Sequence, residues 1–356
     1  MNDNTSQIKK KYFAAANSYD GFISYFDSVF NPKEYSRLFV LKGGPGTGKN
    51  SFMRGIQKRF SEKRFEIEEI YCSSDPTSLD GIIIKDGAEK IAVIDGTAPH
   101  ERDTRVPGAV DEIVNLGQNW DTEWLSSKRD KIIALNDEKQ RAYSTAYQYL
   151  KIGKGAFEFI KNAHISCFDF QSAKMRARKL LEDVKKTEYR EKSVRLVSAF
   201  GKDGSVTLDT IDKISENSLK ISGNYIDAML FICVLMNQSE EKEISYQLSP
   251  YPLCNSLYEA VYFPDSRMGI AITAQDGDVD AETFSKHFST VDASRIKKAE
   301  IILNDAKDEA IRWFKIASDL HFRLEDIYSM AMSFEENDKL LEKTISEIET
   351  IFDKQK

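Results

Sequence analysis

The hydrophobic pattern is dominated by two long segments, 121–192 and 293–356, in which apolar residues recur every three or four positions. This period places apolar side chains along one stripe of a helix, so we expect two long helical segments whose stripes are buried as ordinary core. The stripe of the later segment is predicted to contain Ile302, Ala306, Ala310, Trp313, Ile316, Ala317, Leu320 and Leu324. The less regular stripe of the earlier one is predicted to contain Ile133, Leu135, Ala142, Ala146, Tyr149 and Leu150.

Short apolar runs precede each helical segment and indicate strands. Residues 38–41 and 91–94 are continuous apolar runs, which are typical of strands buried on both faces of a parallel sheet. Several short strings recur at one constant separation: Leu41-Lys42 as Leu219-Lys220, Ser78-Leu79 as Ser256-Leu257, and the run 91–94 as 269–272. Leu135-Asn136-Asp137 recurs as Leu303-Asn304-Asp305 at a smaller separation, which predicts a shorter connection in the second copy.

These repeats predict a duplicated α/β protein. We expect each copy to be a three-layer sandwich with a parallel sheet, followed by a long helical segment. The first copy would span residues 1–192 and carry the phosphate loop described next. The second would span residues 193–356 as a related unit without that loop.

A glycine-rich turn directly follows the predicted strand 38–41. Gly43, Gly48 and Lys49 have the G-x-x-x-x-G-K spacing of a phosphate-binding loop, in which backbone amides surround the β-phosphate and the lysine reaches the β- and γ-phosphates. The helix predicted from residue 50 to about residue 60 would direct its positive end at the anion. The predicted nucleotide-binding residues are Gly44, Pro45, Gly46, Thr47, Gly48, Lys49, Asn50 and Ser51.

The position after the lysine departs from the usual motif. A Ser or Thr there normally supplies a hydroxyl ligand to Mg²⁺, whereas this chain has Asn50, followed by Ser51. A carboxamide oxygen also binds Mg²⁺, so we predict Asn50 and Asp95 as metal ligands, with weaker or altered metal binding. Asp95 ends the apolar run 91–94, where an acidic residue would hold the Mg²⁺ of a bound ATP, through water.

The residue that would activate a water is not fixed by the sequence. The loops that follow two predicted strands offer Asp75 and His100 to orient water or a substrate, besides Lys49 and Asp95 as catalytic residues, and Thr97 to contact the γ-phosphate. Asp75 and His100 are equally well explained as turn or helix caps. Arg102 and Arg105 would neutralise transition-state charge, although a solvated loop arginine is the favoured interpretation of both.

The second copy lacks these groups. At the constant separation Lys49 becomes Asp227, Asn50 becomes Ala228 and Asp95 becomes Thr273, so one nucleotide site per chain is expected, because a carboxylate repels a triphosphate. Oligomers and a protein partner for the helical segments are compatible with the sequence.

Composition adds limits on the location and the partners. A chain that is 41% hydrophobic and 30% charged is typical of a folded protein, and a net charge of −7 argues against a large nucleic-acid footprint. The basic stretch 174–195 is interleaved with acidic residues, as on a solvated helix face. Four dispersed cysteines indicate reduced thiols, and the polar N-terminus together with the lack of a long apolar run predicts a cytoplasmic protein.

The motifs of the first half resemble an uncharacterised family of tandem P-loop ATPases of Gram-positive bacteria. The resemblance is carried by residues 41–49, 72–76, 79–81, 94–100 and 107–110. It implies ATP binding and a two-domain architecture, but no substrate. In that family both halves usually keep a P-loop and Ser-Thr follows the first lysine, which differs from Asn50-Ser51 here.

We therefore expect ATP binding with slow Mg²⁺-dependent hydrolysis that moves the helical segments. Two alternatives stay open. In a small-molecule phosphotransferase, Asp75, Asp80 or His100 would hold an acceptor. A nucleotide-dependent module would bind a protein partner without hydrolysis.

Overall fold

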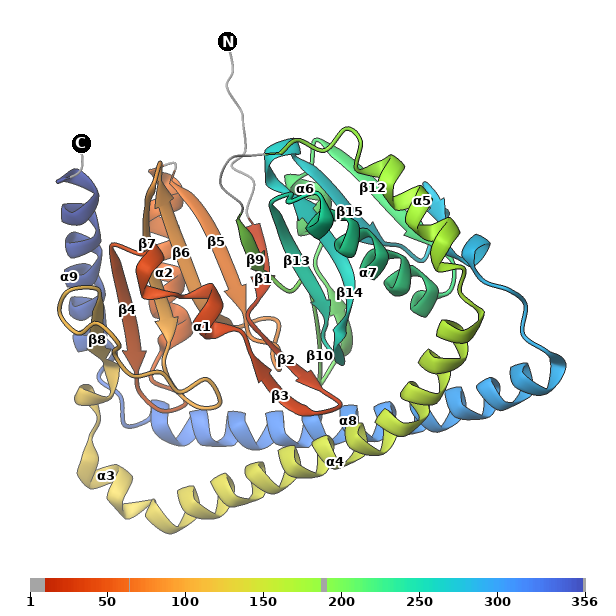
Figure 1. Ribbon diagram of the computed structural model, residues 1–356. Helices are drawn as coiled ribbons and strands as arrows, with labels where there is room; N and C mark the ends of the chain where they lie inside the picture. The colour runs from red at the N-terminus through yellow and green to blue at the C-terminus, as the bar shows by residue number, and fades with distance from the viewer. Residues whose placement is uncertain (1–9, 64, 187–190, 355–356) are drawn as a thin grey trace. The chain divides into compact units, whose positions relative to one another are not determined.

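The computed structural model describes residues 10–63, 65–186 and 191–354 (Figure 1). The polar N-terminal residues 1–9 and part of the basic stretch 174–195 lie outside the described residues. The described residues form a duplicated α/β architecture with two six-stranded sheets, each followed by helices.

The two sheets repeat the same strand order. The first sheet is ordered β1-β5-β6-β7-β4-β8 and the second β9-β13-β14-β15-β12-β16. In each sheet the third strand is antiparallel to both of its neighbours and every other pairing is parallel. The first sheet contains β1 (Lys10–Phe13), β4 (Arg37–Lys42), β5 (Glu66–Tyr71), β6 (Leu79–Asp86), β7 (Glu89–Asp95) and β8 (Asp111–Asn115). The second contains β9 (Lys192–Val194), β12 (Asn217–Ser222), β13 (Tyr246–Tyr251), β14 (Cys254–Phe263), β15 (Met268–Ile272) and β16 (Val279–Asp280). The predicted duplication is confirmed at the level of the architecture.

The predicted all-parallel sheets are instead mixed. Strand β6 joins β7 through residues 87–88, with Gly87 at φ 60°, and such a tight turn connects only antiparallel strands. A parallel partner would have required a crossover of about a dozen residues. The predicted shorter connection in the second copy is present, because residues 96–110 join β7 to β8 whereas residues 273–278 join β15 to β16.

The remaining elements also occur in pairs. The hairpin β2 (Ala15–Ser18) and β3 (Gly21–Ser24) corresponds to β10 (Ser198–Gly201) and β11 (Gly204–Thr207), and the short helix α1 (Phe26–Val29) to α6 (Thr210–Ile214). Helices α2 (Lys49–Glu62) and α7 (Tyr225–Glu241) follow β4 and β12. The first helical segment contains α3 (Thr122–Ser127), α4 (Arg129–Cys167) and α5 (Phe170–Leu180); the second contains α8 (Thr290–Ser329) and α9 (Phe334–Asp353).

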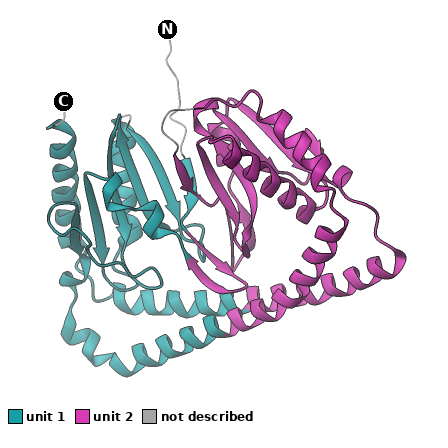
Figure 2. Cartoon of the chain, viewed as in Figure 1, with its two compact units in different colours: residues 1–14, 24–144, 313–356 teal, residues 15–23, 145–312 magenta. Residues whose placement is uncertain are grey.

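The compact units differ from the two contiguous stretches 1–192 and 193–356. Residues 24–144 and 313–354, with β1, form one unit, and residues 15–23 and 145–312 form the other, apart from undescribed positions within them (Figure 2). Helix α9 of the second copy therefore packs on α2 of the first, where Phe60 and Phe352 have ring centroids 6.2 Å apart. Likewise α5 of the first copy packs on α7 of the second. Each unit thus completes its core with a helix from the other copy.

The apolar stripes of the long helices are buried, except that two residues predicted to belong to them are exposed. In the first unit α4 and α8 share a core made of Ile132, Leu135, Ala142, Ala317, Leu320, Leu324 and Ile327. Ile133 and Ile302, which the pattern placed in the stripes, are 43% and 52% exposed, while the adjacent Ile132 and Leu303 are buried. One residue along a helix is a rotation of about 100°, which moves a side chain off a stripe of this width. No helix among the described residues has the length and apolarity to cross a membrane.

Candidate functional site

The glycine-rich loop, residues 43–48, connects the carboxyl end of β4 to α2. Strand β4 is parallel to both β7 and β8, so Lys42, Asp95 and the end of β8 meet at one edge of the sheet. Gly46 and Gly48 have φ of 70° and 82°, a left-handed backbone that side chains other than glycine adopt at a cost. The backbone conformation therefore explains why glycine stands at these two positions of the loop.

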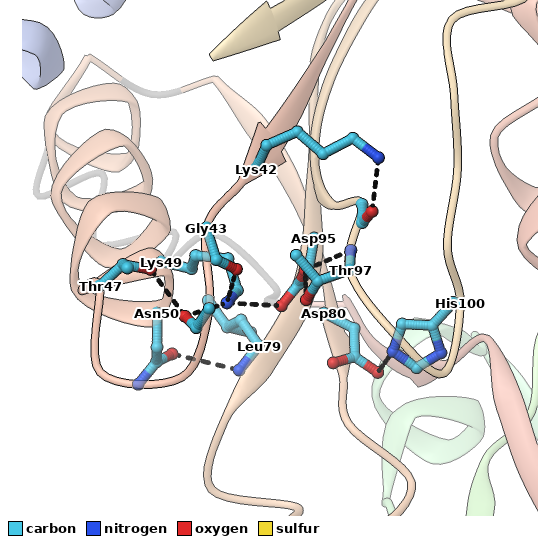
Figure 3. Close-up of polar contacts among 12 residues, drawn as sticks. Lys42, Gly43, Thr47, Lys49, Asn50, Leu79, Asp80, Asp95, Thr97 and His100 are labelled. Carbon is cyan, nitrogen blue, oxygen red and sulfur yellow. Dashed lines mark hydrogen bonds and ion pairs between the residues drawn. The ribbon is translucent and has the colours of Figure 1, made fainter. Parts of the chain in front are cut away.

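Lys49 is the first residue of α2 and folds back over the loop. Its Nζ donates to the carbonyl oxygens of Gly43 and Gly44, at 3.0 and 2.9 Å, and lies 3.7 Å from Asp95 Oδ2 (Figure 3). Both charged side chains are mostly buried, at 13% and 16% exposed, so their attraction is poorly screened. The structure thus brings the loop, the lysine and the strand-end aspartate together.

Asp95 is held in a fixed orientation. Its Oδ1 accepts from the amide and the hydroxyl of Thr97, at 2.8 and 2.6 Å, which leaves Oδ2 facing Lys49. The Thr97 hydroxyl, which the sequence analysis assigned to a γ-phosphate, is therefore engaged with Asp95 in this structure.

Asn50 makes a contact that the metal prediction did not include. Its Oδ1 accepts from the Leu79 amide at 3.1 Å, at the start of β6 (Figure 3). The oxygen assigned to Mg²⁺ is thus bonded to the sheet, and the neighbouring Ser51 is exposed. Among the described residues no cluster of three or more His, Cys, Asp or Glu side chains is arranged to hold a metal ion.

His100 forms a buried pair with Asp80. The His100 Nε2 lies 3.2 Å from Asp80 Oδ2, and the imidazole stacks on Phe26 with centroids 4.3 Å apart. Burial lowers the pKa of His100, but the Asp80 carboxylate and the more distant Asp95 outweigh burial, so the pKa is raised. Gly81 pairs with Ile94 in the antiparallel β6–β7 hairpin, so Asp80 and Asp95, which adjoin this pair, lie at the same end of the hairpin. The site therefore combines two carboxylates with Lys49 and an imidazole that tends to be protonated.

The other predicted loop residues do not join this group. Asp75 Oδ1 accepts from the amide and the hydroxyl of Thr77, which is the turn-capping arrangement. Arg102 is only 5% exposed, so its interpretation as a solvated arginine is wrong. Its guanidinium lies 4.0 Å from Asp111 at the start of β8, and burial lowers its pKa. Arg105 pairs with Asp27 at 2.5 Å.

Residues from distant parts of the chain that the sequence analysis missed pack against the loop. Asn337 of α9 donates through Nδ2 to the Thr47 carbonyl at 2.9 Å, and its Oδ1 accepts from Asn119 Nδ2 at 2.9 Å. A Cβ on Gly44 would lie 3.3 Å from the Trp120 ring, which is paired with Tyr328 at 5.4 Å. A signal for Asn337 does exist, since this asparagine occupies a position on the apolar stripe formed by Phe334, Leu341, Ile345, Ile348 and Phe352.

The second copy replaces the loop by two residues. Gly223 and Asn224 join β12 directly to α7, and the Asn224 side chain caps the Ile226 amide at 2.9 Å. The first residue of α7, equivalent to Lys49, is Tyr225 rather than Asp227, because a shorter loop shifts the alignment there. Asp227 is buried and lies 2.8 Å from His164 Nδ1. In the first copy Asp95 lies opposite Leu41, and in the second Ile272 lies opposite Ile221. The second copy therefore has an isoleucine in the place of Asp95.

The four cysteines are free thiols, as expected from their spacing. No protein-family model, no curated protein and no solved structure matches this chain. The resemblance to tandem P-loop ATPases therefore rests on the motifs of the first half alone.

Proposed function

We propose that the first unit is a P-loop nucleotide-binding domain that binds ATP with Mg²⁺ and hydrolyses it slowly. The observation that carries this proposal is the position of Lys49, which lies between the loop carbonyls and Asp95 at the carboxyl edge of parallel strands. A lysine so placed is 3.7 Å from a carboxylate and beside the first amides of α2, where an anion is favoured.

Each group has a role in this proposal. The amides of the loop and the first turn of α2 would surround the phosphates, and Lys49 would leave the loop carbonyls to contact the β- and γ-phosphates. Asp95, oriented by Thr97, would hold Mg²⁺ through water, and the Mg²⁺ would neutralise phosphate charge. Asn50 would join the metal ligands only after releasing the Leu79 amide.

Asp80 is the best-placed carboxylate to orient an attacking water. It lies at the same end of the β6–β7 hairpin as Asp95, and the His100 imidazole lies 3.2 Å from its Oδ2. His100 itself is a positioning residue, because it is 93% buried and its raised pKa favours the protonated form, which cannot accept a proton.

One observation favours a non-hydrolysing binding module as the second candidate. The bond between Asn50 and Leu79 removes from the site the only side-chain ligand that the loop motif offers to the metal. A protein that binds ATP without placing Mg²⁺ correctly would hydrolyse it hardly at all.

Calorimetric titration of ATP with Mg²⁺ tests the proposal, with Lys49→Ala as the disabling variant. Lys58→Ala is the matched control, because Lys58 is exposed on the same helix. We expect binding in the unaltered protein and in the control, and none in Lys49→Ala. Binding that survives Lys49→Ala would contradict a P-loop site.

Phosphate release from the same samples separates the two candidates. Under the hydrolase proposal release is measurable, is lost in Asp95→Asn, and rises in Asn50→Thr, which restores a hydroxyl ligand. Release that is absent from the unaltered protein but appears in Asn50→Thr would favour the binding module.

A further inference from the structure

The turn between α8 and α9 lies directly on the glycine-rich loop. We name residues 325–337 the α8–α9 corner. A Cβ on Gly46 would stand 2.5 Å from the Glu325 carbonyl oxygen and 3.0 Å from the Ser329 nitrogen, so backbone touches backbone. Gly48 faces the Phe334 ring, and Asn337 bonds to the Thr47 carbonyl. The corner and the loop are thus packed together without room for a further group at Gly46.

The contact places negative charge on the loop. Helix α8 ends at Ser329, so the negative end of its dipole lies against the glycine-rich loop. Helix α2 begins at the other end of this loop, with the positive end of its own dipole. Glu325 adds a carboxylate in the last turn of α8. Its pKa is lowered, first by a hydrogen bond from His321 and also by the Gly46 amide and the charge of Lys49. The carboxylate is therefore ionised at neutral pH; it is 39% exposed, lies 3.5 Å from His321 Nε2, and belongs to the residue whose backbone packs on Gly46.

A triphosphate and this corner compete for the same partners. The Gly46 amide and Lys49 bind phosphate in the function proposed above, on which this inference rests. Two anions that share such a site repel each other. The corner and a triphosphate therefore compete for the loop under the proposed function.

We propose that Glu325 acts as an internal anion on the glycine-rich loop, and that ATP binds by displacing Glu325 and the end of α8 from Gly46. The corner is an autoinhibitory contact: it stabilises the nucleotide-free loop and lowers its affinity for ATP. The second copy of the duplication thereby contributes, through α8, a regulatory carboxylate to the site of the first.

Titration of ATP with Mg²⁺ into Glu325→Gln tests this role, with Asp326→Asn as the matched control. Asp326 is the next residue of the same helix turn and is exposed. Removing one charge-assisted contact that competes with the ligand is expected to lower the Kd about three- to tenfold in Glu325→Gln and to leave it unchanged in Asp326→Asn. Circular dichroism and thermal unfolding establish that both variants are folded.

A fluorescence readout follows the displacement itself. Trp120 lies against Gly44 and 5.4 Å from the Tyr328 ring, so its emission responds when the end of α8 moves. In a Trp124→Phe, Trp313→Phe background, which leaves Trp120 as the single tryptophan of the three, we expect ATP to shift this emission. Glu325→Gln without ATP is expected to shift it partly in the same direction.

Other outcomes overturn the inference in distinguishable ways. An unchanged or weaker affinity in Glu325→Gln, with Lys49→Ala still abolishing binding, rejects the internal anion and leaves the nucleotide site intact. Unchanged affinity with lost hydrolysis would make Glu325 a catalytic base instead. Absence of ATP binding in every variant contradicts the proposed function itself, and this inference with it.

Discussion

The His100 imidazole and the Asp80 carboxylate form a buried pair, with Nε2 3.2 Å from Oδ2, next to the aspartate that faces Lys49. The pair is sealed from solvent by Phe26, which stacks on the ring. Asp80 and Asp95 lie at the same end of the β6–β7 hairpin, where two nearby carboxylates would repel each other. His100 and Lys49 offset this repulsion from opposite sides, so the site is an alternating arrangement of charges whose members stabilise one another.

Asp80→Asn is expected to destabilise the first unit most strongly at low pH. The raised pKa of His100 means that the pair stabilises the fold below the ordinary histidine pKa of 6.5, and that this contribution is lost as pH rises through the folded-state pKa. Breaking a buried pair by removing one partner costs about 3 kcal/mol. Urea unfolding at pH 6 and pH 9 measures the effect, with the exposed Asp86→Asn of the same strand as control. Equal losses at both pH values would contradict a charged pair.

Glu259 is expected to make the stability of the second unit depend on pH in the neutral range. Burial raises the pKa of this carboxyl from 4.5 to about 7, although hydroxyl groups of Ser198 and Tyr225 donate to it. The folded state therefore binds more protons than the unfolded state between these values, and stability falls as pH rises from 4.5 to 7, by about 3 kcal/mol at most.

Glu259→Gln should flatten this dependence, because the amide does not titrate. Thermal unfolding from pH 4.5 to 8 measures it, and the exposed Glu182→Gln serves as control. A variant as pH-sensitive as the unaltered protein would show that Glu259 is ionised throughout.

Local motifs could be predicted from the sequence because they depend on neighbouring residues. The strand 38–41, the loop, the helix after Lys49 and the position of Asp95 all follow from short-range pattern, and β4, α2 and β7 occur where they were expected. Duplication was predicted from short strings that recur at one separation, but the strand pairing makes Ile221, and not Leu219, the equivalent of Leu41, so these strings do not mark equivalent positions. The antiparallel β6 was missed because a buried apolar run such as residues 82–84 looks the same in parallel and antiparallel sheets.

Contacts between distant segments could not be predicted in this way. Asn337 and Glu325 reach the loop only because α9 packs on a unit built mainly from the first copy, and no local period encodes which sheet a helix will cover. Lys49 was aligned with Asp227 for a similar reason, because the loop 43–48 corresponds to residues 223–224 only once the strands and helices on either side of it are known. Side-chain partners such as Leu79 for Asn50 depend on the same tertiary placement.

Gly46→Ala is expected to weaken the closed loop. At φ 70° an alanine costs about 1 kcal/mol in backbone energy, and its Cβ would also stand 2.5 Å from the Glu325 carbonyl, so the corner must move away. Gly87→Ala is the matched control, because Gly87 has φ 60° with open space around it. Thermal unfolding should show a loss clearly larger for Gly46→Ala than for Gly87→Ala. Equal losses would mean that the α8–α9 corner moves away from the new Cβ at no cost in stability.

Asn337→Leu is expected to detach the α8–α9 corner from the loop while preserving an apolar stripe on α9. Asn337 is 7% exposed and both ends of its carboxamide are bonded, to the Thr47 carbonyl and to Asn119 Nδ2. Leucine satisfies neither, so two buried polar groups lose their partner, at a cost of about 1 to 3 kcal/mol each. Urea unfolding of Asn337→Leu and of Asn119→Ala, which disturbs only the second bond, separates the two contributions. We expect a larger loss of stability in Asn337→Leu than in Asn119→Ala, together with faster amide hydrogen exchange in α9. Equal losses of stability in the two variants would show that the bond to Thr47 contributes nothing, and that Asn337 acts only through Asn119.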